Sequence, residues 1–137
     1  MTAVVDFPVI DPVQRFIAET KGLLIGGEWR PAQSGRTFPT HDPASGEKIT
    51  DVAHGTAADI DLAVAAARRA YDGPWSRFTP SQRQSLLWKV GDALLARAKE
   101  FGQLESIDNG KSAAIAEGVD VVWAANVFHY YAGWATK

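Results

Sequence analysis

The last stretch of the chain, residues 112–137, constrains the fold most strongly, because it predicts a helix that is apolar on most of its circumference. Apolar side chains recur there at steps of three and four, which is the spacing of one helix face. They form two separate rows: Gly118, Val121, Ala125, Phe128 and Ala132 in one, and Trp123, Val127, Tyr130 and Trp134 in the other. A helix with two apolar rows must be covered on more than one side. We therefore expect the chain to be the front part of a larger folded body.

Two other helices are predicted before this one. The first starts at Thr56, an N-cap residue with Asp59 at the capping-box position, and ends at Gly73. Its expected buried stripe is Ile60, Ala63, Val64, Ala67 and Tyr71. The second starts at Thr79 and its capping box, and the pattern continues without a break to Gly110. At 1.5 Å per residue, that helix would be about 40 Å long.

The first half of the chain predicts short strands instead of helices. Residues 23–25 and 28–30 flank a glycine pair and read as a hairpin. The stretch 42–47 is the strongest turn signal, and a further strand is expected at 48–53. Residues 1–20 read as an arm that lies on something else. The chain alone is thus predicted to be mostly α with short N-terminal β-hairpins, and to need a sheet from elsewhere.

The composition of the chain argues against several functional classes. The net charge is −2 and there is no run of Lys or Arg, so neither nucleic acid nor an anionic membrane is an expected partner. There is no cysteine, which excludes a thiol nucleophile within these 137 residues. No apolar run reaches the roughly 20 residues that span a bilayer. The start of the chain does not resemble a signal peptide, and we expect a cytoplasmic protein.

Few side chains suggest chemistry on their own. The three histidines are scattered and lack the spacing of zinc ligands. Asp120 is the exception, because it is a carboxylate on a helix where charge is otherwise rare. It either has a structural partner or lines a binding cleft, since a buried charge needs compensation. The aromatic residues of the last helix favour core packing and an apolar pocket over base stacking, because no basic groove accompanies them.

Five strings nevertheless carry a resemblance. They are LLIGGEW at 23–29, DPASGE at 42–47, the helix 63–71 before a Pro-Trp pair, LESIDNGK at 104–111 and YYAGW at 130–134. In this order and over nearly the whole chain, they resemble the start of an NAD(P)-dependent aldehyde dehydrogenase.

That resemblance implies an α/β parent protein with a Rossmann-like dinucleotide-binding domain. Residues 21–137 would be the N-terminal part of that domain, preceded by the arm 1–20. The family oxidises a small-molecule aldehyde through a cysteine thioester and passes a hydride to NAD or NADP. None of the catalytic or cofactor-binding residues falls in this chain, so the chain alone is expected to be inactive. A homodimer or homotetramer is the expected assembly.

The resemblance also implies a monovalent cation site. In family members that hold Na+ or K+, the matching positions are Thr40, His41 and Asp108, which supply oxygen donors suited to a hard cation. The alternative is that Asp108 only caps the end of the second helix.

The last helix would line the entrance tunnel of the aldehyde, at positions that match Val119, Asp120 and Trp123. A tryptophan there suggests an apolar or aromatic aldehyde, whereas Asp120 would instead suit an amino-aldehyde.

Two non-enzymatic functions stay open at this point. One is a helical scaffold that docks a partner protein through the aromatic helix. The other is a remnant that pairs with full-length subunits in an oligomer.

Overall fold

The computed structural model describes residues 7–137, which are mostly helical with two small antiparallel sheets. In chain order the elements are α1 (Asp11–Ala18), β1 (Leu23–Ile25), β2 (Glu28–Arg30), β3 (Thr37–His41), β4 (Lys48–Ala53), α2 (Ala57–Asp72), a 3-10 helix η1 (Pro74–Arg77), α3 (Pro80–Ala96), α4 (Ala98–Asn109), α5 (Ala113–Ile115), a π-helix η2 (Ala116–Asp120) and α6 (Val121–Ala132). This balance of elements confirms the fold predicted for the chain. None of the helices described is long and apolar enough to cross a membrane.

Two hairpins make up the β structure. In the first, β1 pairs with β2 across Gly26 and Gly27, whose φ angles of 66° and 87° suit glycine. In the second, β3 pairs with β4 across the predicted turn. The carboxylate of Asp42, which is buried, holds that turn by accepting bonds from the amide of Ala44 and the hydroxyl of Ser45, each at 2.9 Å. The sequence predicted this turn and the strand after it, and the second hairpin agrees with the predicted short N-terminal β-hairpins.

The predicted capping boxes begin both long helices. The carboxylate of Asp59 accepts a hydrogen bond from the amide of Thr56 at 2.8 Å, and Gln82 does the same for Thr79 at 2.8 Å. Asp59 also accepts a bond from the amide of Gln33 at 3.0 Å, so it ties the loop after β2 to the start of α2.

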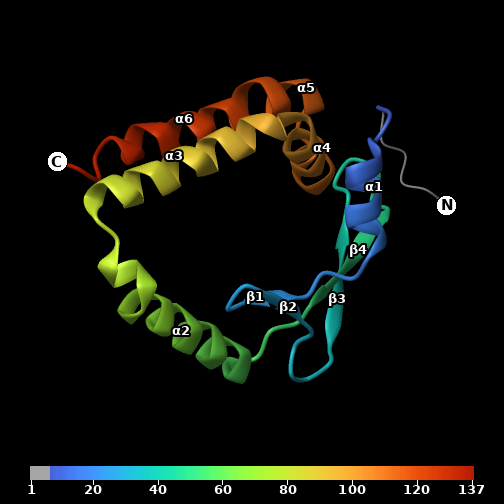
Figure 1. The fold of residues 1–137 in the computed structure, drawn as a ribbon. Helices are drawn as coiled ribbons and strands as arrows, with labels where there is room; N and C mark the ends of the chain where they lie inside the picture. Colours follow the sequence, from blue (N-terminus) through green and yellow to red (C-terminus); the bar gives the residue numbers. More distant parts are fainter. Residues whose placement is uncertain (1–6) are drawn as a thin grey trace.

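The second helix is not continuous, and that prediction was wrong. Arg97 leaves the helical region at φ −120° and ψ 25°, which divides the segment into α3 and α4. The amide of Arg97 still bonds to the carbonyl of Leu94, and its carbonyl accepts from Phe101, so few backbone bonds are lost at the break. Because of the break, the two helices pack against different elements. α3 packs along α6, whereas α4 packs against η2 and α1 (Figure 1).

The last helix also differs from the prediction that it runs uninterrupted to residue 137. It begins as α5, widens into one π-helical turn, and continues as α6 only to Ala132. In the π turn the amide of Val121 donates to the carbonyl of Ala116, five residues back. Beyond Ala132 the amide of Gly133 is shared between the carbonyls of His129 and Tyr130, which tightens the chain into turns.

Residues 8–18, part of the predicted arm, are held against α4. Gln103, which is buried, accepts a hydrogen bond from the amide of Ile10 at 2.9 Å and donates one to the carbonyl of Pro8 at 3.0 Å. Val13 of α1 is fully buried. The arm therefore docks on this chain itself from residue 8 onward; its first six residues lie outside those described.

Only one of the two apolar rows of the last helix is covered. Val121, Ala125 and Ala132 are buried, and the carbonyl of Ala125 approaches Gly91 of α3 so closely that an added Cβ would lie 3.0 Å from it. The second row of the last helix is exposed, at Trp123, Val127, Tyr130 and Trp134. Most of the predicted stripe of α2 is exposed too, at Ile60, Val64 and Tyr71. The stripe predicted to be buried on α2 is thus largely exposed in this chain, because α2 packs mainly on η1 and β1.

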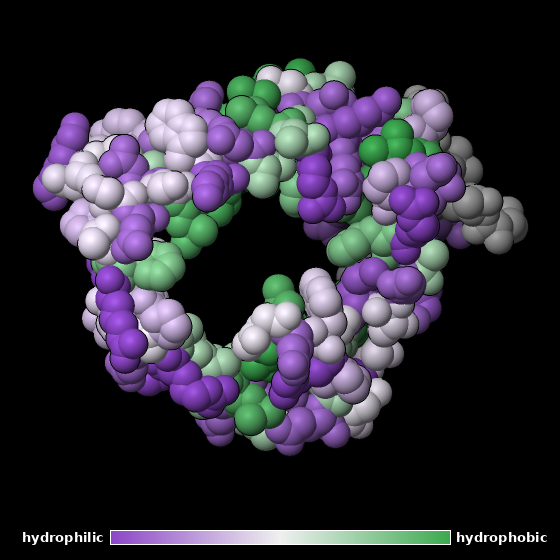
Figure 2. Space-filling view, viewed as in Figure 1, coloured by the Kyte–Doolittle hydropathy of each residue, from purple (hydrophilic) through white to green (hydrophobic). Residues whose placement is uncertain are grey.

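The elements are arranged around an open centre. The hairpins and α1 lie opposite α3 and α6, and α2 completes the circuit (Figure 1). The space-filling view shows the opening, with apolar residues along parts of its border (Figure 2). Residues 7–137 therefore have several small areas of packing and no single closed core.

Candidate functional site

A pocket of the described residues lies where the β3–β4 hairpin, α1, α4 and the start of α6 meet. Its volume is about 510 Å³. Most of its surface is apolar and comes from Phe16, Ile17, Ile49, Val52, Leu94, Phe101, Leu104, Ile107, Val121 and Ala124. Its polar groups are Lys21, Thr40, Thr50, Glu105, Asp108 and Asp120. It thus has the composition of a binding pocket, an apolar lining with a few convergent polar groups.

Two of the three residues predicted for a cation site share this pocket. Thr40, at the end of β3, and Asp108, in the last turn of α4, both line it. His41 is exposed and does not contribute to its lining. Within residues 7–137 no three His, Asp or Glu side chains gather as metal ligands. The predicted cation site would use backbone oxygens as well, and it stays a prediction.

The three predicted tunnel residues are divided between two surfaces. Asp120 is half-buried and lines the pocket, at the point where η2 ends. Val119 and Trp123 lie outside the pocket and are exposed, with Trp123 at 69 %. They form an apolar surface beside the pocket, and their role in a tunnel stays a prediction.

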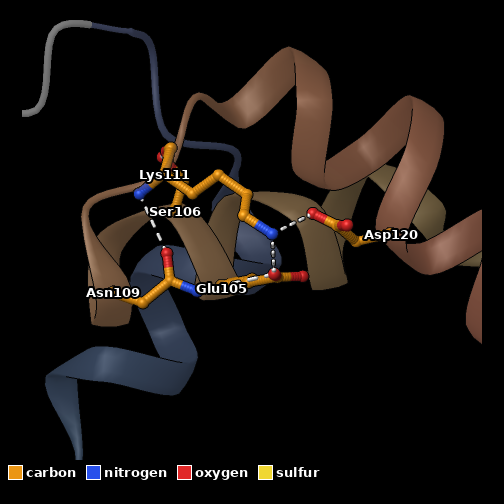
Figure 3. Close-up of polar contacts among 5 residues, drawn as sticks. All are labelled: Glu105, Ser106, Asn109, Lys111 and Asp120. Atoms are coloured by element: carbon orange, nitrogen blue, oxygen red, sulfur yellow. Dashed lines mark hydrogen bonds and ion pairs between the residues drawn. The ribbon is translucent and has the colours of Figure 1, made fainter.

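Lys111 is the central residue of this region, and the sequence did not single it out. Its ammonium group lies 2.5 Å from the carboxylate of Asp120 and 3.4 Å from that of Glu105 (Figure 3). Its backbone is fixed too: the amide donates to the side chain of Asn109 at 2.9 Å, and the carbonyl accepts from the hydroxyl of Ser106 at 2.6 Å. Lys111 therefore links the end of α4 to the π turn.

The electrostatics of this cluster favour a charged lysine. The hydrogen bond to Asp120, followed by the bond to Glu105, raises the pKa of Lys111 above its ordinary value. Asp120 therefore has the structural partner that its position on an apolar helix requires. A lysine directly after a helix-ending glycine, with an acid nine residues later, was the available sequence signal.

A glycine brings the two backbones of this region together. Gly102 of α4 is buried, and a Cβ added to it would lie 2.6 Å from the backbone nitrogen of Glu117 in the π turn. Only a residue without a side chain permits this approach. Sequence analysis missed Gly102, because glycine inside a helical pattern does not reveal what it contacts.

The described residues do not form a dinucleotide-binding loop. The one glycine pair, Gly26 and Gly27, makes the turn of the β1–β2 hairpin and is followed by a strand. A phosphate-binding loop needs a helix N-terminus behind it.

Comparison with known proteins identifies the family. The model of the aldehyde dehydrogenase family matches residues 29–137. The chain belongs to the aldehyde dehydrogenase family. It is 41 % identical to the mitochondrial benzaldehyde dehydrogenase of Antirrhinum majus, over 98 % of this chain and 25 % of the relative. It is 45 % identical to aldehyde dehydrogenase 1 of Tanacetum cinerariifolium, over 84 % of this chain and 23 % of the relative.

A solved aldehyde dehydrogenase has the same fold over this region. The structure of the Bacillus cereus aldehyde dehydrogenase with NAD+ superposes with a TM-score of 0.92 and 37 % identity, covering 95 % of this chain and 27 % of that one. The chain spans about a quarter of the length of the aldehyde dehydrogenases that it matches, and it corresponds to their N-terminal region.

Proposed function

We propose that this chain supplies the N-terminal region of an NAD(P)-dependent aldehyde dehydrogenase, which oxidises an aldehyde to a carboxylic acid. The family match over residues 29–137 is the observation that carries the proposal. The chain has no cysteine, so the thiolate that forms the thioester comes from protein outside these residues. We expect the 137 residues alone to be inactive, and the complete enzyme to be a cytoplasmic homodimer or homotetramer.

The part of the chain proposed to meet the aldehyde is the surface around the π turn. Val119 and Trp123 present an exposed apolar surface there. The charge of Asp120 is already compensated by Lys111 at 2.5 Å, so it is a weak site for a substrate cation. This arrangement supports an apolar or aromatic aldehyde over an amino-aldehyde.

We also propose a monovalent cation site in the pocket that Asp120 lines. Thr40 and Asp108 line it together, and both carry oxygen donors suited to Na+ or K+. His41 would contribute only its backbone oxygen, since its side chain is exposed outside the pocket lining.

The test is a hybrid enzyme. Residues 29–137 replace the matching segment of the Bacillus cereus aldehyde dehydrogenase, which shares their fold. We expect this hybrid to reduce NAD+ when benzaldehyde is added, as followed by NADH absorbance, with the unaltered Bacillus cereus enzyme measured beside it. The 137-residue chain alone should produce no NADH.

Two results would contradict the proposal. NADH production by the isolated chain would show that the chemistry does not lie elsewhere. A hybrid that is insoluble or inactive, beside an active parent enzyme, would show that these residues do not replace the family's own.

The exposed aromatic row favours one other function, a scaffold that docks a partner protein. Trp123, Tyr130 and Trp134 are each more than half exposed. A stable monomer of 14.8 kDa in sedimentation, together with an inactive hybrid, would support this second function.

A further inference from the structure

The π turn is held to α4 at two points. On one side, Gly102 allows the backbone of Glu117 to lie against α4. On the other side, the ammonium of Lys111 joins the carboxylates of Glu105 and Asp120 (Figure 3). Between the two points the chain has the wider hydrogen bonding of a π-helix, which is frequently found at functional sites.

The ion pair has a specific consequence for the shape of this region. Lys111 is the bridging cation between two carboxylates, and both of them bond the same nitrogen, at 2.5 Å and 3.4 Å. Without it, Asp120 and Glu105 would face each other as like charges and repel. Asp120 is the last residue of η2, so its displacement would move the start of α6 away from α4.

The apolar surface beside the pocket depends on the same turn. Val119 directly precedes Asp120, and Trp123 follows it by three residues. Both side chains are exposed in this chain, so the backbone that carries them sets their position here. Their position therefore follows that of the backbone at Asp120.

We propose that Lys111 is a positioning residue for substrate recognition: by holding Asp120 it fixes the π turn, and thereby the apolar wall of Val119 and Trp123 that an aromatic aldehyde would contact. This inference rests on the proposed function. It assigns Lys111 no contact with the substrate, and it predicts an effect on substrate binding that depends on the size of the aldehyde.

The hybrid enzyme provides the test, with KM and kcat measured for benzaldehyde and for acetaldehyde. In Lys111→Met we expect KM for benzaldehyde to rise roughly threefold to tenfold while kcat changes less than about twofold. Acetaldehyde is smaller and would contact less of the apolar wall. Its KM should therefore change by less than about twofold. Lys111→Arg keeps the positive charge and should restore the KM for benzaldehyde.

A charge exchange and a matched control complete the design. Lys111→Glu and Asp120→Lys should each raise the KM for benzaldehyde, whereas the double variant should return it toward the starting value, because the pair is re-formed. Lys99→Met removes a positive charge from an exposed position on α4 and should leave both KM values unchanged. If one single variant is insoluble, the other single variant and the double variant still decide the result.

The outcomes separate this inference from the proposed function. An inactive unmutated hybrid would refute the proposed function and, with it, the inference. An active hybrid in which Lys111→Met leaves the KM values unchanged, or raises both equally, would overturn the inference alone. The same holds if neither Lys111→Arg nor the charge exchange restores the KM for benzaldehyde.

Discussion

Two glycine-to-alanine substitutions, sixteen positions apart, should shift stability in opposite directions. At Gly102 an added Cβ would lie 2.6 Å from the nitrogen and 2.7 Å from the Cα of Glu117, and ordinary contact begins at 3.4 Å. The π turn would have to move away from α4 by about 0.8 Å, since backbone atoms cannot yield as a flexible side chain does. Overpacking of this kind costs about 1–3 kcal/mol, and a backbone contact belongs at the upper end of that range.

The helix propensity of alanine offsets part of this cost. Alanine is about 1 kcal/mol more favourable than glycine inside a helix, which leaves a net destabilisation of about 2 kcal/mol for Gly102→Ala. At Gly118, in the π turn itself, an added Cβ would have no atom of the described residues within 4 Å apart from the adjoining backbone of its own helix. Gly118→Ala should therefore gain up to about 1 kcal/mol.

Urea unfolding of the chain, followed by far-UV circular dichroism, measures both effects. We expect the midpoint of Gly102→Ala to fall by about 1 M, and the midpoint of Gly118→Ala to rise slightly, with unchanged m-values. The thermal midpoint of Gly102→Ala should fall by about 7 °C. If both variants shift in the same direction, or if Gly102→Ala is as stable as the unaltered chain, the close contact between α4 and the π turn is refuted.

Three further substitutions test other parts of the structure. Thr79→Ala removes the N-cap of α3 and should cost about 1 kcal/mol in urea unfolding, whereas an unchanged midpoint would contradict the capping box. Gln103→Leu should release the segment around Ile10, seen as faster hydrogen exchange of the Ile10 amide; equal exchange would show that other contacts hold it. The bond from the Thr56 amide lowers the pKa of Asp59, so its contribution to stability is complete above pH 3.8 and is lost as the pH falls through the lowered pKa. In Asp59→Asn, the free energy of unfolding should therefore fall less steeply as the pH is lowered. An unchanged dependence on pH would show that other carboxylates cause the loss of stability in acid.

Local signals were sufficient to predict how most elements begin and how the turns form. Thr79 and its capping box act within one helical turn, and Gly26 and Gly27 make the hairpin turn with their own φ angles. These interactions involve neighbours in sequence, so the residues themselves determine them. The same is true of the turn at Asp42, whose partners follow it by two and three residues.

The interruptions of the helices could not be predicted in the same way. Arg97 is a good helix former within an unbroken apolar pattern, and the break there follows the different partners of α3 and α4. The π turn likewise depends on Gly102 and the contact with Glu117, fifteen residues away. Tertiary packing overrides local propensity at both places.

The site was only partly accessible from sequence. Asp120 stood out because it is charged on an apolar helix, but its partner, Lys111, lies in the preceding loop. The pairing became visible only when α4 and η2 were placed side by side. The meeting of Thr40 and Asp108 at one pocket also depends on long-range contacts, here between the β3–β4 hairpin and α4.

The hydrogen bonds of Gln103 impose an order on folding during synthesis. They hold Pro8 and Ile10 through a side chain that is added 93 residues after Ile10. At translation rates of about 5–20 residues per second, the segment around Ile10 waits about 5–20 s for the side chain that holds it. During that interval a chaperone can reach the nascent N-terminal segment before α4 is present to receive it.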